Sequence, residues 1–193
     1  MALNPTGLYD LAQTLLACVC AELTATSELI EGQPGCPLRA CVVPGAVAWD
    51  GCDGACAGLG TCGQLSVSIA RIYASTNFPV EDRTVQGLRG CTPPPTTAAE
   101  FVITLLRCTP TLDDQGCPPP CDDMDASAKV LYTDMATVAN AIVCCLPGTA
   151  PRGRRFLLGQ TKAVGPEGGC VGVEQRVTVA LAGCYTCPSE ESP

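Results

Sequence analysis

The stretch LSVSIA, residues 65–70, decides the fold, because bulky apolar side chains alternate in it with small ones. Strict alternation is typical of a β-strand that turns one face to a core and the other to solvent. We expect this strand to continue to about Ala74. The stretch FVITLL, residues 101–106, repeats the pattern and predicts a second central strand. The two strands are expected to pair antiparallel, with residues 76–97 as an elaborated hairpin connection.

Two helices are predicted, one before and one after this hairpin. Leucines recur at helical spacing from Leu8 onward, and Asn4 followed by Pro5 is typical of a helix N-terminus. A helix is therefore expected over about residues 5–30. Apolar residues recur in the same way over about residues 124–145, behind a group of aspartates that suits the positive end of a helix dipole.

Three further strands complete the predicted order. A short strand is expected at 41–43, another opens at 156–158, and a closing strand covers 171–181 after a turn at 165–169. The order is one helix, three strands, a second helix and two strands. It predicts an α+β fold in which two helices pack on a mostly antiparallel sheet with long cysteine-rich loops.

The length of 193 residues suits one domain. We expect a single α+β domain over residues 1–187, with loop insertions at about 44–63 and about 76–97. The last six residues, 188–193, are expected to form a flexible acidic tail.

The composition argues against several classes of function. The chain contains no histidine, which removes Ser-His-Asp and Cys-His catalysis and histidine metal ligands. Its net charge of −8 makes it a poor candidate for gripping a phosphate backbone. We therefore expect a structural component of a larger assembly and not an enzyme. No apolar run long enough to cross a membrane and no secretory signal are expected, so synthesis in a cytosol is predicted.

Sixteen cysteines in 193 residues is a density typical of disulfide-stapled secreted domains. Synthesis in a reducing cytosol followed by exposure to an oxidising exterior, as for a virus particle released by lysis, is one history that accommodates them. Free buried thiols and zinc are the alternatives, although zinc sites usually show two paired knuckles and only Cys184 and Cys187 form a CxxC. The adjacent Cys144 and Cys145 are expected to contact different neighbours. The disulfide candidates are Cys36, Cys41, Cys52, Cys56, Cys62, Cys91, Cys117, Cys121, Cys170, Cys184 and Cys187.

Two ligand-binding patterns are better explained by structure. Residues 58–63 match GxGxxG, but they precede a strand instead of following one, so nucleotide binding is not expected. The aspartates between Asp113 and Asp125 lack the spacing of a calcium-binding EF-hand, so helix capping and solvation explain them better. No cofactor and no metal are expected.

Basic and aromatic residues supply the candidate contacts with partners. Arg71 and Arg107 lie on the two central strands and are expected at an exposed sheet face or a subunit seam, with a salt bridge as the equal alternative. Trp49 stands alone in a cysteine-rich loop, where packing of that loop is the favoured role. The candidate interface residues are Arg71, Arg107, Trp49, Arg152, Arg154 and Arg155.

Four segments of the chain resemble a cysteine-rich neck protein of long-tailed phages that infect actinobacteria. They are Cys62–Leu65, Ala70–Tyr73, Leu105–Pro110 and Gly165–Gly172. In those proteins a helix that closes with two cysteines precedes the Gly-Pro-x-Gly-Gly-Cys turn, as residues 125–145 do in this chain. The likeness spans most of residues 63–181, and the final turn is its most specific part.

The resemblance implies a tail terminator, a virion protein that forms a ring, usually a hexamer, which caps the tail tube and joins it to the head connector. The implied partners are further copies of the chain, the tail tube protein and the connector or stopper proteins. DNA would pass through the lumen without specific binding, and no membrane is involved. Such a protein assembles in the host bacterial cytoplasm and resides in the neck of the virion. The resemblance implies no catalytic residue.

Three alternatives stay open. A head-to-tail stopper or adaptor would be similar in size and role. A secreted disulfide-rich binding module predicts a monomer. A zinc-binding assembly factor predicts bound metal and loss of structure with a chelator.

Overall fold

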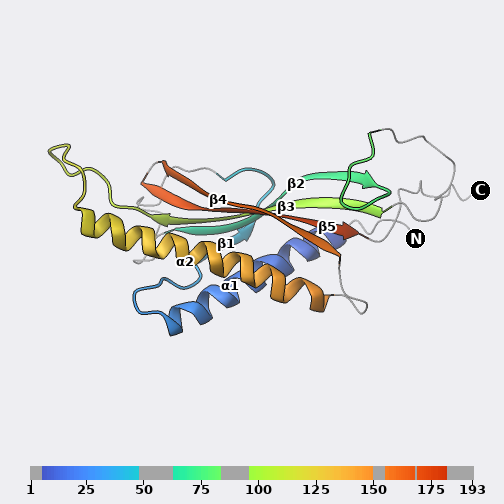
Figure 1. Cartoon of the computed structure of the whole chain (residues 1–193), viewed down its shortest axis with the longest axis horizontal. Helices are drawn as coiled ribbons and strands as arrows, with labels where there is room; N and C mark the ends of the chain where they lie inside the picture. The colour runs from blue at the N-terminus through green and yellow to red at the C-terminus, as the bar shows by residue number, and fades with distance from the viewer. Residues whose placement is uncertain (1–5, 48–62, 84–95, 150–154, 168, 182–193) are drawn as a thin grey trace, which may run out of the picture.

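The computed structural model describes residues 6–47, 63–83, 96–149, 155–167 and 169–181 (Figure 1). The predicted order of helices and strands is confirmed. The elements are α1 (Gly7–Leu29), β1 (Arg39–Val42), β2 (Gln64–Ser75), β3 (Thr96–Cys108), α2 (Cys121–Cys145), the 3-10 turn η2 (Leu146–Thr149), β4 (Phe156–Glu167) and β5 (Cys170–Leu181).

The strands form one mixed sheet in the order β1-β2-β3-β5-β4. The predicted hairpin of β2 and β3 is confirmed: the strands are antiparallel, and Val67 lies opposite Ile103. β5 pairs antiparallel with both β3 and β4. Only β1 runs parallel to its neighbour, β2, so the sheet is mostly antiparallel as expected. β3 is therefore the central strand, with two partners over nearly its whole length.

Both helices lie on the same face of the sheet and cross each other there (Figure 1). The core between the layers is built from α1 residues such as Leu15 and Val19, from Phe101 and Ile103 of β3, and from Ile142 of α2, all of which are fully buried. Burial of such side chains contributes about 1.5–3 kcal/mol each, which is what fixes the helices to this face. The alternation that predicted the strands thus separates the face that the helices cover from the opposite face, on which Leu106 and Cys170 form a second, smaller buried cluster.

The two helices begin and end close to the predicted positions. α1 starts at Gly7 with Thr6 as its N-cap, and the predicted cap at Asn4 and Pro5 lies outside the described residues. α2 starts at Cys121, earlier than predicted. The residue before it, Pro120, is extended at φ −57° and ψ 149°, so the helix begins directly where the run of prolines ends.

The turn predicted at 165–169 is shorter than expected. β4 continues to Glu167, which pairs with Cys170 after an irregularity that follows Val164. Gly165 and Gly169 have φ values of 92° and 72°, a region that favours glycine. The glycines therefore serve a bulge and a tight turn in one hairpin. The insertions expected at 44–63 and 76–97 fall mostly outside the described residues, as does the tail at 188–193.

We expected no segment with the length and apolar composition of a membrane-spanning helix, and by these two criteria the expectation is wrong. Both α1 and the segment Cys121–Gly148 meet those two criteria. Core helices of soluble proteins meet them too, and each of these helices buries one side against the sheet and the other helix. Packing therefore accounts for the buried apolar residues of both helices.

Replacing Gly172 with alanine is expected to destabilise the fold. A Cβ at this position of β5 would overlap the carbonyl oxygen of Leu105 and the side chain of Leu106 on β3. We expect Gly172→Ala to lower the free energy of unfolding by about 1–3 kcal/mol, the usual range for overpacking. Gly148→Ala is the control, since a Cβ there meets nothing within 4 Å. Urea denaturation of both variants measures the difference, and equal stability would contradict this close packing.

Candidate functional site

Within the described residues, several hydrogen bonds converge on a buried ion pair between the sheet and α2. Arg107, near the end of β3, is 5% exposed, and Asp134, in the middle of α2, is 0% exposed. The Nε and Nη2 of Arg107 donate to the two carboxylate oxygens of Asp134 at 2.9 and 3.1 Å. This two-pronged geometry is the strongest that arginine forms with a carboxylate.

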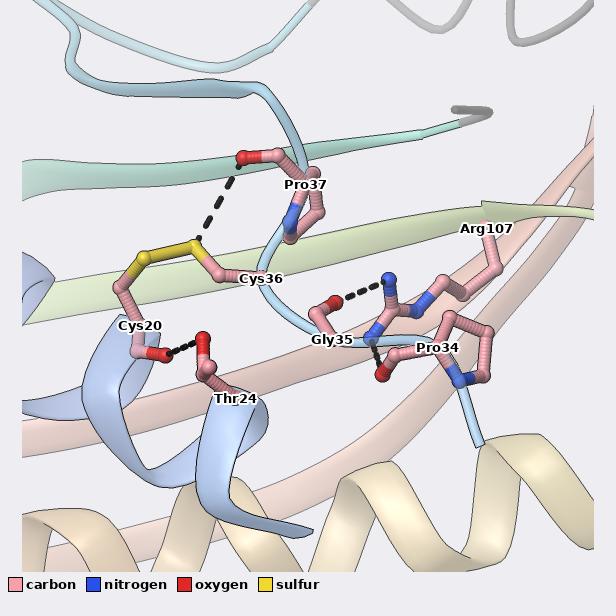
Figure 2. The surroundings of a disulfide bond; sticks show 7 residues. All are labelled: Cys20, Thr24, Pro34, Gly35, Cys36, Pro37 and Arg107. Carbon is pink, nitrogen blue, oxygen red and sulfur yellow. Dashed lines mark hydrogen bonds between the residues drawn. A yellow bond between two sulfur atoms is a disulfide. The ribbon is translucent and has the colours of Figure 1, made fainter. Parts of the chain in front are cut away.

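Residues 33–35, which follow α1, complete the coordination of this pair. Arg107 donates to the backbone oxygen of Gly35 at 2.9 Å and to that of Pro34 at 3.1 Å (Figure 2). The side chain of Gln33 donates to Asp134 at 2.8 Å. Buried charges are tolerated when their hydrogen-bonding groups are satisfied in this way. Arg107 is therefore an internal brace. The expectation that it lies at an exposed face or subunit seam is corrected, because its guanidinium binds Asp134 and the loop, and the salt bridge that was the equal alternative is confirmed.

A disulfide fastens the same loop to α1. Cys20 of α1 is bonded to Cys36, directly after the residues that Arg107 holds (Figure 2). A second disulfide joins Cys18 of α1 to Cys145 at the end of α2, across 127 residues of sequence. Two cysteines two residues apart on α1 thus connect it to the loop and to the other helix.

The sequence predictions for the cysteines are confirmed in part. Cys36 and Cys170 are disulfide-bonded as expected, and Cys108 is also bonded. Cys144 is exposed and free while Cys145 is bonded, so the prediction that these neighbours make different contacts is confirmed. The candidates outside the described residues are Cys52, Cys56, Cys62, Cys91, Cys184 and Cys187.

Three disulfide candidates are corrected, because Cys41, Cys117 and Cys121 are free thiols. Cys41 lies opposite Ser66 on β2, so no cysteine faces it across the strand pair. Cys117 and Cys121 are separated by three prolines, which hold the chain extended. The bonded cysteines that the sequence reasoning missed are Cys18, Cys20, Cys108 and Cys145.

A ladder of alternating charges crosses four strands on the other face of the sheet. Arg71 on β2 binds Glu81 at 2.7 Å and Glu100 on β3 at 2.6 Å. Arg176 on β5 binds Glu100 at 2.9 Å and Glu174 at 3.1 Å. Lys162 on β4 completes the ladder by binding Glu174 at 3.2 Å. Glu100 neighbours the core residue Phe101 in sequence, so the ladder lies on the face opposite the helices.

The ladder lowers the pKa of its central carboxylate, Glu100. Burial raises the pKa of Glu100, but the hydrogen bonds and positive charges of Arg71 and Arg176 together lower it by more. The pKa of Glu100 is therefore below its ordinary value. The hydrogen bond to Glu100 raises the pKa of both arginines. The Arg71 guanidinium also lies 4.7 Å from the ring centre of Tyr73. Arg71 is thus on an exposed sheet face, as expected, and it makes the salt bridge that was the alternative.

The remaining interface candidates divide between described and undescribed parts of the chain. Arg155, just before β4, is exposed, donates to Thr96 at 3.2 Å and lies 5.6 Å from the ring centre of Phe78. It ties the start of β4 to the loop after β2. Trp49, Arg152 and Arg154 lie outside the described residues.

A groove of about 580 Å³ borders the Arg107 brace. It opens between the 34–37 loop, the end of β3 and the first half of α2. Its lining is mostly apolar and consists of Pro34, Gly35, Cys36, Pro37, Arg107, Cys108, Pro110, Asp123, Ala126, Ser127, Val130, Leu131 and Val171. The lining holds no pair of carboxylates for acid–base catalysis. Across the described parts of the chain, no three cysteine or acidic residues gather in a way that would hold a metal ion.

Comparison with known proteins adds no relative. No protein-family model matches the chain, and no curated protein is significantly similar to it.

Replacing Glu100 with glutamine is expected to remove a pH-dependent contribution to stability. A carboxylate whose pKa is lowered by folding stabilises the fold above its unfolded pKa, and that contribution is lost as the pH falls through the lower, folded value. Glu100→Gln is therefore expected to be less stable than the natural protein near neutral pH. The difference is expected to shrink as the pH falls below the ordinary carboxyl pKa of 4.5.

Thermal unfolding between neutral and acid pH measures this effect. Glu28→Gln is the matched control, because Glu28 is an exposed residue of α1. A stability difference for Glu100→Gln that stays constant across the whole pH range would show that the ladder does not bind the ionised carboxylate.

Proposed function

We propose that the chain is a structural virion protein of a phage neck, and that it acts as a tail terminator. In this role copies of the chain form a ring that caps the tail tube and joins it to the head connector. The proposal begins from the resemblance carried by Cys62–Leu65, Ala70–Tyr73, Leu105–Pro110 and Gly165–Gly172.

The observation that carries the proposal is that distant parts of this resemblance form one structural unit. Leu106 lies opposite Gly172, and Cys108 lies opposite Cys170. Gly63 packs on the backbone of Leu106 in the same region, at a φ of 106°. Segments separated by up to about a hundred residues therefore meet at one end of the sheet. A likeness made of residues in mutual contact is stronger support for a shared fold than scattered matches, although a fold alone does not fix a function.

The use of the charged residues favours assembly over catalysis. Arg107 is occupied by Asp134 and by two backbone oxygens, and the charge ladder on the opposite sheet face is paired along its length. Catalytic groups are usually recognised in a cleft by perturbed pKa values that structural contacts do not explain. The perturbed groups in the described residues belong to the ladder on the sheet surface instead.

The architecture suits repeated contacts between copies. Among the described elements, both helices cover one face of the sheet, and the outer edges of β1 and β4 have no neighbouring strand. Head-to-tail contacts between different surfaces of identical chains close into a ring when the rotation allows it. A head-to-tail stopper or adaptor is the nearest alternative within the same assembly. The disulfides also favour a secreted disulfide-rich binding module, which would be a monomer.

Mass measurement of the full, untagged chain tests the proposal. We expect light scattering and native mass spectrometry, with and without reductant, to show a ring of several copies or a reversible monomer that joins isolated tail tubes. Addition of a zinc chelator is the control and is expected to leave the mass unchanged. A strict monomer that ignores tail tubes, or a chain that carries stoichiometric zinc, would contradict the proposed function.

A further inference from the structure

Three free and exposed thiols lie at the two ends of α2. Cys121 is the first residue of the helix, and Cys117 lies just before it. Cys144 is the last residue but one of the same helix. By contrast, six other described cysteines are bonded, so this chain is one in which disulfides form: Cys18, Cys20, Cys36, Cys108, Cys145 and Cys170. Exposed thiols left over in such a chain point to pairing between molecules.

The two ends of α2 cannot be joined by a disulfide within one molecule. At the usual rise of about 1.5 Å per residue, the Cα atoms of Cys121 and Cys144 lie about 35 Å apart. A disulfide requires Cα atoms within about 7 Å of each other. The helix is a rigid spacer between the thiols, and its C-terminal end is tied to α1 by the disulfide of Cys145.

The two thiols at the start of the helix are also kept apart from each other. Between Cys117 and Cys121 stand Pro118, Pro119 and Pro120. A residue before proline is restricted to extended conformations, and Pro120 itself has a ψ of 149°. A polyproline spacing of about 3.1 Å per residue separates the two Cα atoms by about 12 Å. The two thiols are therefore too far apart to form a disulfide with each other.

The segment that carries Cys117 is presented to the outside. We call residues 109–121, from the end of β3 to the first residue of α2, the arm; it projects beyond the end of the sheet (Figure 1). Asp113 gives the arm its shape: its side chain accepts a hydrogen bond from the amide of Cys117 at 2.8 Å, and its own amide donates to the carbonyl of Cys117 at 3.1 Å. Every residue from Thr111 to Pro118 is exposed.

Charge opposes pairing of one arm with another but does not oppose pairing of opposite ends. Four aspartates surround the arm thiols: Asp113, Asp114, Asp122 and Asp123. Two arms brought together would place like charges side by side. The last ten residues of α2, 136–145, contain no charged residue, and Val143 beside Cys144 is 47% exposed. The end that carries Cys144 therefore offers a neutral, partly apolar surface.

We propose that neighbouring copies of this chain are joined head to tail by disulfides between an arm thiol, Cys117 or Cys121, and Cys144 of the next copy. This inference rests on the proposed function, because it assigns the covalent contact between subunits of the ring. In the reaction two thiols lose their protons and two electrons, and a disulfide such as oxidised glutathione takes them up as two molecules of the reduced thiol. The link forms after assembly, when the particle reaches an oxidising exterior.

Oxidation of the full chain tests the proposal. Protein purified under reductant is transferred to oxidised glutathione, remaining thiols are blocked with an alkylating agent, and the products are separated by electrophoresis without reductant. The natural chain is expected to give a ladder of linked copies that disappears on reduction. Cys41→Ser is the matched control and is expected to leave the ladder intact, because this half-buried thiol lies on β1.

Mixing two variants identifies the polarity of the link. Cys144→Ser alone and the double variant Cys117→Ser/Cys121→Ser alone are each expected to stay unlinked. Their mixture is expected to give a linked band of two chains but not the long ladder of the natural chain, because each copy keeps only one reactive end. Peptide mass spectrometry of that band is expected to show an arm cysteine joined to Cys144.

Other outcomes would overturn the proposal. They are a natural chain that stays unlinked after oxidation, a Cys144→Ser variant that still forms linked pairs, and arm thiols bonded to a cysteine of their own chain. Light scattering in reductant separates this proposal from the proposed function. Rings that form in reductant but never become linked would contradict the disulfides between copies and leave the proposed function intact. A chain that neither assembles nor joins tail tubes would contradict the proposed function.

Discussion

The buried ion pair between Arg107 and Asp134 is the constraint on which the arrangement of the layers depends. It joins the central strand β3 to the middle of α2, and the same guanidinium holds the backbone of the loop that leaves α1. Apolar packing fixes which face of the sheet the helices cover, but it is not directional. The ion pair adds direction, because two charges without solvent require their partners in one geometry.

The disulfides extend this constraint to α1. Cys36 follows the residues that Arg107 holds, and its bond to Cys20 connects the loop to α1. The bond between Cys18 and Cys145 closes the other side by joining the helices directly. Cross-links of this kind stabilise mainly by restricting the unfolded chain, with typical values of about 2–4 kcal/mol each. The helical layer is thus a single braced unit.

Much of the fold was predictable because it depends on local periodicity. Alternation in residues 65–70 and 101–106 located β2 and β3 and their antiparallel pairing. The parallel pairing of β1 was not predictable in the same way, because four residues carry too little pattern to show direction. The start of α2 was displaced because proline acts on the residue before it and leaves the residue after it free to begin a helix.

The braced junction was harder to predict, because its residues are far apart in sequence. Arg107 was expected at an exposed face or subunit seam or, equally, in a salt bridge. Its burial was not predictable from the strand alone, because its partner lies 27 residues away in the next helix. A signal was present: Asp134 falls on the apolar side of α2, between the buried Leu131 and Val138. An acidic residue on an apolar helix face implies a buried cation. Cys18 and Cys20 gave no comparable signal, because a free cysteine is also common at buried positions of a protein.

A thermodynamic cycle on the ion pair tests this account most directly. The free energy of unfolding is measured for the natural chain, Arg107→Met, Asp134→Leu and the double variant, all with disulfides intact. We expect each single replacement to cost about 3–5 kcal/mol, because it strands a buried charge, and the double replacement to cost much less than the sum. Single losses below about 1 kcal/mol that simply add in the double variant, as for an exposed pair, would contradict the central place given to this interaction.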